Sequence, residues 1–140
     1  MQPPLTRFLQ AQESTYETAL SEIRSGRKVS HWMWYIFPQI KGLGFSKTSR
    51  YYAIQGVEEA KAYLNDPVLG FRLREITEEL LKLEENDAYK VFGSPDDLKL
   101  KSSMTLFAMA DNTDRNNFKK VLGKFFNGEI DQRTVEQLKQ

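Results

Sequence analysis

Residues 30–39 read Ser-His-Trp-Met-Trp-Tyr-Ile-Phe-Pro-Gln, and this stretch decides how the chain must fold. Both tryptophans and the only histidine, His31, lie in it, and residues 32–37 carry no charge. So apolar a segment is stable only where other elements cover it. Its aromatic residues favour a strand, whereas Ser30 as an N-cap and Pro38 as a stop favour a short buried helix. We predict the helix, because the chain offers no convincing partner strand.

The composition is that of one globular domain. With 140 residues, 40% of them hydrophobic and 28% charged, the chain can bury its own core, and we predict a single domain over residues 1–140. It has no cysteine, which excludes disulfides, thiolate metal sites and cysteine nucleophiles. The N-terminus has no basic segment followed by an apolar one, and no apolar run approaches the ~20 residues of a membrane helix. These patterns predict a cytoplasmic location and no membrane partner.

Outside the aromatic stretch, apolar residues recur at helical spacing, and no repeat or linker divides the chain. We therefore predict an all-α fold, a single compact multihelical globular domain with buried central helices and the aromatic run at its centre. The core is expected to span about residues 5–127, and residues 128–140 to form a weakly attached helix. The other expected helices are 5–23, with a possible break near Ser14; 57–64; one from Asp66-Pro67 to Leu83; one capped by Ser94 and continuing past Pro95 to Ala108; and one from Thr113 to Phe126.

Charge is distributed unevenly, although the net charge is only +1. Residues 23–57 contain Lys and Arg but no Asp or Glu, whereas over residues 58–97 the carboxylates outnumber the basic residues. A near-neutral chain exerts no long-range attraction on nucleic acid, and the aromatic run is not interleaved with Lys and Arg, so we predict no nucleic-acid partner. The basic window is either ordinary solvated surface or a local positive field beside the aromatic run, suited to a phosphate or carboxylate.

His31 and Trp34 are the candidate functional residues within the aromatic run. Imidazole titrates near neutral pH, so His31 could act as a general base or contact a ligand. No acidic residue stands near it in the sequence, so an orienting carboxylate would have to come from a distant segment, Asp96 or Asp97, and Asp97 is the second candidate catalytic residue. The alternative is a buried histidine bonded to a backbone carbonyl. Indole combines a large apolar face with one donor, so Trp34 could stack on a nucleobase or sugar, although core packing is the commoner fate. Trp34 shares a helix side with His31, whereas Trp32 points elsewhere.

A second candidate cluster lies near residue 100. Ser102 and Ser103 follow Lys99 by three and four positions, which places one ammonium and two hydroxyls on one side of a helix. Such a set could hold a phosphate or carboxylate. The alternative is that the serines permit close helix packing and bond to their own backbone, with Lys99 in solvent. Neither serine has the glycine elbow or adjacent base of a catalytic nucleophile.

The known cofactor and metal motifs are missing. Gly42-x-Gly44 lacks the preceding strand and the third glycine of a dinucleotide fingerprint, and no Walker loop occurs. One histidine and scattered carboxylates give no metal-ligand spacing. We predict neither a cofactor nor a metal ion.

Several segments share the pattern of one known family: Ser30–Trp34, Phe37–Gln39, Gly42–Gly44 with Ser46, Tyr52–Ile54, Pro67–Gly70, Asp97–Lys99 and Ser102–Phe107. Together they resemble the bacterial domain-of-unknown-function family 1810. The likeness runs from about Leu5 to Phe126 and implies a multihelical fold with central buried helices. It implies no activity, cofactor or catalytic residue. Asp66 stands where the family pattern often has a histidine, so a histidine there is not an obligatory catalyst.

Two functions follow from these observations. The first is binding of an anionic, nucleotide-like small molecule in a cleft beside the aromatic run; if a reaction occurs, it is hydrolysis with His31 or Asp97 as the acid–base group. The second is a non-enzymatic protein-interaction or structural module in which the aromatic run is simply core and the partner is unknown. The expected ligand-binding residues of the first are Trp34, Gln39, Ser46, Arg50, Lys99, Ser102 and Ser103.

Overall fold

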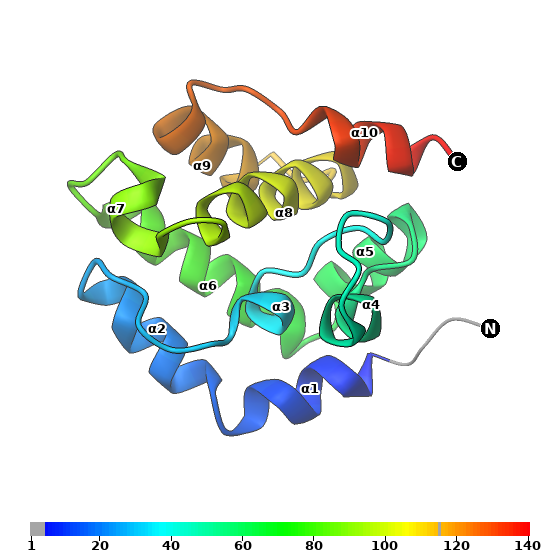
Figure 1. Cartoon of the computed structure of the whole chain (residues 1–140), viewed down its shortest axis with the longest axis horizontal. Coiled ribbons are helices and arrows are strands. Elements are labelled where there is room, and N and C mark those ends of the chain that lie inside the picture. The colour runs from blue at the N-terminus through cyan, green and yellow to red at the C-terminus, as the bar shows by residue number, and fades with distance from the viewer. Residues whose placement is uncertain (1–4, 115) are drawn as a thin grey trace.

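The computed structural model describes residues 5–114 and 116–140, and the all-α prediction is confirmed in this part of the chain. Its one strand-like feature there is a parallel bridge between Ile40 and Ile54. None of the helices described is long and apolar enough to cross a membrane. In chain order the helices are α1 (Thr6–Glu13), α2 (Tyr16–Arg24), α3 (Met33–Ile36), α4 (Lys47–Tyr52), α5 (Val57–Asn65), α6 (Leu69–Lys82), α7 (Ala88–Phe92), α8 (Asp96–Ala110), α9 (Asn117–Phe126) and α10 (Gln132–Leu138) (Figure 1).

Helix α8 is the central element of the fold. It packs against α5, α7, α9 and α10, and Figure 1 shows α9 and α10 running along one side of it, with α1 and α2 at the opposite edge of the molecule. Residues 102–108 of α8 are buried without interruption, so this helix has no solvent-facing stripe over that stretch. The sequence predicted the aromatic run at the centre of the fold, but α8 holds that position. Its apolar and small polar residues allow other elements to pack on all of its sides.

The aromatic run forms only a single helical turn, α3. Trp32 and Phe37 flank this turn and are both fully buried. The predicted cap is wrong: the Ser30 hydroxyl and amide both donate to the carboxylate of Glu22, at 2.6 and 2.9 Å. Because Glu22 lies on α2, the entrance to the run is fixed by a contact with another helix rather than by a local cap.

Two predicted helix boundaries are confirmed. The first apolar stretch, residues 5–23, divides into α1 and α2 at Ser14, where a possible break was predicted. Asp66 begins the next long helix: its Oδ2 accepts the amides of Val68 and Leu69, at 3.0 and 2.9 Å. The carboxylate satisfies backbone donors that would otherwise lack partners at the start of α6.

Two other boundaries differ from the prediction. Helix α8 begins at Asp96 with Pro95 at the N-cap position, so Ser94 lies one residue too early to cap it, and the Ser94–Pro95 peptide is cis. Helix α9 begins after Asn116, whose Oδ1 accepts the Lys119 amide at 3.1 Å, and not at Thr113. Both errors arise because several capping residue types stand close together, and sequence pattern does not choose among them.

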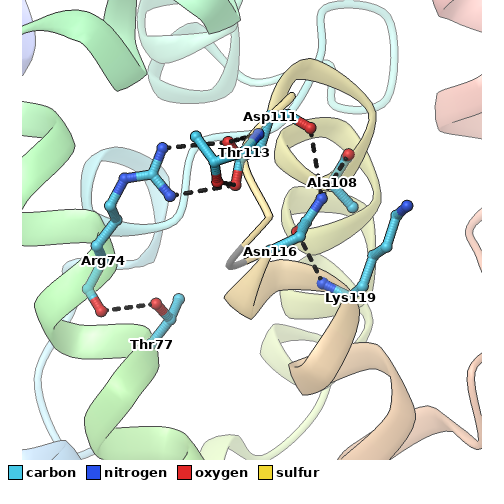
Figure 2. A network of polar contacts seen from close by, with 7 residues as sticks. All are labelled: Arg74, Thr77, Ala108, Asp111, Thr113, Asn116 and Lys119. Atoms are coloured by element: carbon cyan, nitrogen blue, oxygen red, sulfur yellow. Dashed lines mark hydrogen bonds and ion pairs between the residues drawn. The ribbon is translucent and has the colours of Figure 1, made fainter.

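The connection between α8 and α9 is held by a polar network (Figure 2). The guanidinium of Arg74 on α6 donates to both oxygens of Asp111, at 3.1 and 3.3 Å, and the Asp111 side chain is 1% exposed. The amide and hydroxyl of Thr113 donate to the same carboxylate, while Asn116 donates to the carbonyl of Ala108 at 3.0 Å. Burial raises the pKa of Asp111, but the bonds from Arg74 and Thr113 outweigh it and hold this pKa below its usual value. Thr113 therefore fixes the connection instead of opening a helix.

Helix α10 is tied to α8 by a chain of hydrogen bonds. Asp131 precedes α10, and its Oδ2 accepts the hydroxyls of Thr134 and Ser102, the latter at 2.9 Å. The Asp131 amide donates to the Thr105 hydroxyl at 2.9 Å, and Thr134 is fully buried. These contacts place α10 along α8, where it forms one side of the groove described below. The division into a core of residues 5–127 and a weakly attached C-terminal helix stays a prediction.

Candidate functional site

A groove lies between the loop that follows the aromatic run and the α8–α10 pair, and it consists of two adjoining hollows. The first has a volume of about 220 Å³ and combines two aromatic side chains with basic and amide groups. Trp34 comes from α3, Arg50 and Tyr52 from α4, and Gln39 from the loop. The complete lining of the first hollow is Trp34, Gln39, Ile40, Lys41, Gly42, Gly44, Ser49, Arg50, Tyr52, Ala53 and Gln55.

The wall of the first hollow is fixed by backbone pairing and by a buried ion pair. The Ile54 amide donates to the Gln39 carbonyl and the Lys41 amide to the Ile54 carbonyl, both at 2.9 Å. Behind this wall the Arg7 guanidinium, 2% exposed, donates to the backbone carbonyls of residues 51 and 53, at 2.8 Å each, and to Glu59 at 3.0 Å. Residues 51–55 are thus held against α1 and α5 by charge-assisted bonds.

The second hollow, of about 420 Å³, lies against α8 and the start of α10. It shares Gln39, Gly44 and Ser49 with the first hollow, so the two hollows adjoin. Its lining holds three basic side chains and the carboxylate of Asp131, but no aromatic ring. The complete lining is Gln39, Leu43, Gly44, Ser49, Pro95, Leu98, Lys99, Lys101, Ser102, Asp131 and Arg133.

Lys99 lies where the two hollows meet. Its Nζ is 5.1 Å from the centroid of the Trp34 ring, within the range of a cation–π contact, and the same side chain lines the second hollow. Asp96 is the other partner of Lys99, at 3.7 Å. The Lys99 side chain is 27% exposed, so this ammonium remains available to an anion in the groove. The structure therefore brings Trp34 and Lys99, two of the residues predicted from sequence, into one site.

The charges that line the groove are mostly positive. One carboxylate, Asp131, is present, and its Oδ2 is already occupied by the hydroxyls of Ser102 and Thr134. A concave surface with such an excess of cations attracts anions. The basic side chains are Lys41 and Arg50 in the first hollow and Lys99, Lys101 and Arg133 in the second.

Comparison with known proteins gives one family and one solved structure. The model of the family described as "Protein of unknown function (DUF1810)" matches residues 2–138. The chain belongs to this family. The crystal structure of the conserved hypothetical protein Rv1873 from Mycobacterium tuberculosis is 47% identical, with a TM-score of 0.92, over 97% of this chain and 96% of that one. A search of curated proteins found no match. The resemblance noted in the sequence is therefore confirmed, as is the multihelical fold.

Four residues predicted for the site lie outside both hollows: His31, Ser46, Asp97 and Ser103. His31 is exposed at the start of the aromatic run. Asp97 accepts the amide of Leu98 at 2.9 Å in the first turn of α8. Ser46 caps α4, where its Oγ accepts the Ser49 amide at 3.0 Å and bonds the Ser49 hydroxyl at 2.6 Å. The groove therefore contains neither of the two residues assigned to acid–base chemistry.

The two serines of α8 have different surroundings. Ser102 lines the second hollow, and its hydroxyl donates to Asp131 at 2.9 Å and to the Leu98 carbonyl at 3.3 Å. Ser103 is fully buried on another side of the helix, and its hydroxyl has no hydrogen-bond partner among the described residues. Adjacent helical positions point about 100° apart. The predicted cluster is therefore divided: Lys99 and Ser102 line the groove, whereas Ser103 lies in the core. Gln39 and Arg50 line the groove as well.

Glu22 is an organising residue that sequence analysis missed. Its carboxylate accepts the Val29 amide at 2.7 Å, the Ser30 amide and hydroxyl, and the indole N–H of Trp32 at 2.9 Å. Burial raises the pKa of Glu22, but these hydrogen bonds outweigh it and lower the pKa to about 2. Trp32 is thus a structural residue, and Trp34 is the tryptophan that reaches the groove.

Lys28 connects the segment that Glu22 holds to α8. Its Nζ donates to the Ser30 carbonyl at 2.6 Å, pairs with Asp96 at 2.8 Å and lies 4.9 Å from the centroid of the Trp32 ring. Asp96 therefore stands between two lysines, one placed over each tryptophan. This arrangement fixes the aromatic run, and with it the Trp34 face of the groove, against the first turn of α8.

Lys41, Lys101 and Arg133 are the basic groove residues that were not predicted from the sequence. Lys41 lay within the basic window, which was a usable signal, whereas Lys101 and Arg133 carry no local pattern and meet the site only because α10 packs on α8. Across residues 5–114 and 116–140, no three His, Asp or Glu side chains gather closely enough to hold a metal ion.

Proposed function

We propose that this DUF1810 protein binds an anionic, nucleotide-like small molecule in the groove. The observation that carries the proposal is the contact of Trp34, in a hollow with aromatic and basic walls, with Lys99, in an adjoining hollow that has basic side chains and no aromatic ring. An indole face suits a planar ring, and ammonium and guanidinium groups suit phosphate or carboxylate. The groove thus supplies both kinds of contact that a nucleotide requires.

The proposal is limited to binding. His31 and Asp97, the residues through which hydrolysis was expected, line neither hollow, and Ser102 is already bonded to Asp131. A general base must come within hydrogen-bond reach of the proton that it removes. The cytoplasmic location and the absence of nucleic-acid and membrane partners remain predictions of the sequence.

A thermal-shift screen against nucleotides, sugar phosphates and ADP-ribose derivatives tests the proposal. We expect at least one of them to raise the melting temperature in proportion to the logarithm of its concentration, because a ligand that binds only the native state stabilises it. Replacement of Lys99 by Met should weaken this binding roughly tenfold through loss of one charged contact. Lys61→Met is the matched control, since Lys61 also has an i,i+3 carboxylate partner, Glu58, but lies outside the groove. If no compound stabilises the protein, the proposal is wrong.

One observation favours the second function, a protein-interaction module. Met109 and Ile130, 51% and 41% exposed, border an open apolar hollow of about 580 Å³ beside α8 and α9. Exposed apolar surface of this kind is typical of protein contacts. An interaction module is the function that would remain if the screen finds no ligand.

A further inference from the structure

The two hollows differ in their aromatic groups, whereas basic side chains line both. Trp34 and Tyr52 line the first hollow, and the second has no aromatic lining residue. A planar ring therefore finds faces to stack on in the first hollow alone. A ligand with one planar ring would therefore place that ring in the first hollow and its remaining groups toward the second.

The second hollow has the composition of an anion site. Arg133 is exposed and has no ion pair among the described residues, and Lys101 has one, a 3.5 Å contact with Glu129, which is 71% exposed. Exposed ion pairs of this kind are weak and readily exchanged for a stronger partner. Both cations are thus available to phosphate oxygens, and Arg133 can offer two parallel N–H donors.

The sizes of the hollows favour a ligand that extends through both. The first hollow, at about 220 Å³, is smaller than the ~300–1,000 Å³ of ordinary ligand sites, whereas the second, at about 420 Å³, falls within that range. A nucleotide whose ring fills the first hollow is too large for that hollow alone and continues past Lys99. A single phosphate at Lys99 would leave Arg133 without an anionic partner and Lys101 with only its contact to the exposed Glu129.

We infer that the ligand is a nucleoside 5′-diphosphate or a longer nucleotide, with its base beside Trp34, its first phosphate at Lys99 and its second at Lys101 and Arg133. This inference rests on the proposed function and makes it more specific. It assigns ring recognition to the first hollow and the discrimination between mono- and diphosphate to the second.

Calorimetric titration with adenosine and guanosine, their 5′-mono- and diphosphates, and inorganic pyrophosphate tests this assignment. For one of the two bases we expect the diphosphate to bind at least roughly tenfold more tightly than the monophosphate, since each added phosphate gains charged contacts. Replacement of Arg133 by Met should weaken binding of the diphosphate about tenfold and leave the affinity for the nucleoside unchanged. Trp34→Leu should weaken nucleoside and diphosphate alike but not pyrophosphate. Arg27→Met, at an exposed arginine outside both hollows, is the control and should change none of these affinities.

The outcomes separate the inference from the proposed function. If nucleotides bind but the diphosphate is no tighter than the monophosphate, or Arg133→Met leaves its affinity unchanged, the inference is overturned and the proposed function stands. If pyrophosphate alone binds as tightly as the diphosphates, base recognition at Trp34 is overturned. If none of these compounds binds, while sugar phosphates do in the screen, the nucleotide assignment fails. Arg133 is exposed, so its variant tests the phosphate end without disturbing the core.

Discussion

Replacement of Arg7 by Met is expected to lower the free energy of unfolding by about 3–5 kcal/mol, the cost typical of breaking a buried ion pair from one side. Arg7 and Glu59 are 2% and 3% exposed and lie 3.0 Å apart. Without the guanidinium, the Glu59 carboxylate stays buried without its cation, and the carbonyls of Tyr51 and Ala53 lose their donors. Urea unfolding at neutral pH, analysed by linear extrapolation, measures the loss.

The double variant Arg7→Met/Glu59→Leu is the control for this explanation. Removing both charges eliminates the unpaired carboxylate, so the double variant should be more stable than Arg7→Met alone. A loss below about 1 kcal/mol in Arg7→Met would be that of an ordinary surface substitution and would contradict the role of this pair. The pair also supports residues 51–55, so its loss should weaken ligand binding in the first hollow.

Gly70→Ala is the second substitution expected to have a large effect. A Cβ at residue 70 would lie 2.1 Å from the backbone carbonyl oxygen of Leu64, far inside van der Waals contact. The obstacle is backbone rather than a flexible side chain, so α5 and α6 must move apart where the chain turns between them. We expect a loss of about 3 kcal/mol, at the upper end of the usual cost of overpacking, measured by urea unfolding.

Gly123→Ala is the matched control, because Gly123 lies inside α9 and a Cβ there would meet no atom within 4 Å. Alanine is the better helix former by about 0.5–1 kcal/mol, so this variant should be more stable than the natural chain. The two Gly→Ala substitutions should thus have opposite signs. Stabilisation of both by similar amounts would show that helix propensity and not the contact with Leu64 determines the result.

The sequence was sufficient to predict the fold class because helical periodicity is a local property. The break near Ser14 lies where the apolar periodicity is interrupted, and the start at Asp66 follows from a side chain that accepts amides of its own helix. The extent of α3 could not be predicted, because Ser30 bonds to Glu22 on another helix instead of capping its own. The central position of α8 was also missed, since burial on every side leaves no amphipathic stripe to detect.

The candidate site could be predicted only in part, because the sequence shows residue types but not tertiary contacts. Trp34 and Lys99 were recognisable as residue types suited to a ring and an anion, and the fold brings them together. His31 drew attention by its chemistry alone, and its position outside the groove depends on tertiary contacts. Arg133 could not be predicted, because it reaches the groove only through the packing of α10 on α8.

The roles of the two tryptophans explain the aromatic run as a whole. Trp32 is fully buried and donates to Glu22, so it fixes the run in the fold. Trp34, two residues later, is half-buried and presents its ring to Lys99 and the groove. The run is therefore both a packing element and one wall of the site, which accounts for its apolar and aromatic composition.

These two indoles make possible the most direct test of the groove as a binding site. In a ¹⁵N–¹H correlation spectrum of the labelled protein, the two indole N–H signals can be followed while each ribonucleoside 5′-diphosphate is titrated. We predict that the signal of Trp34 moves and saturates with at least one of them, while the signal of Trp32, hydrogen-bonded to Glu22 in the core, stays in place. A titration in which neither signal moves, or in which only the Trp32 signal moves, would contradict binding in the groove.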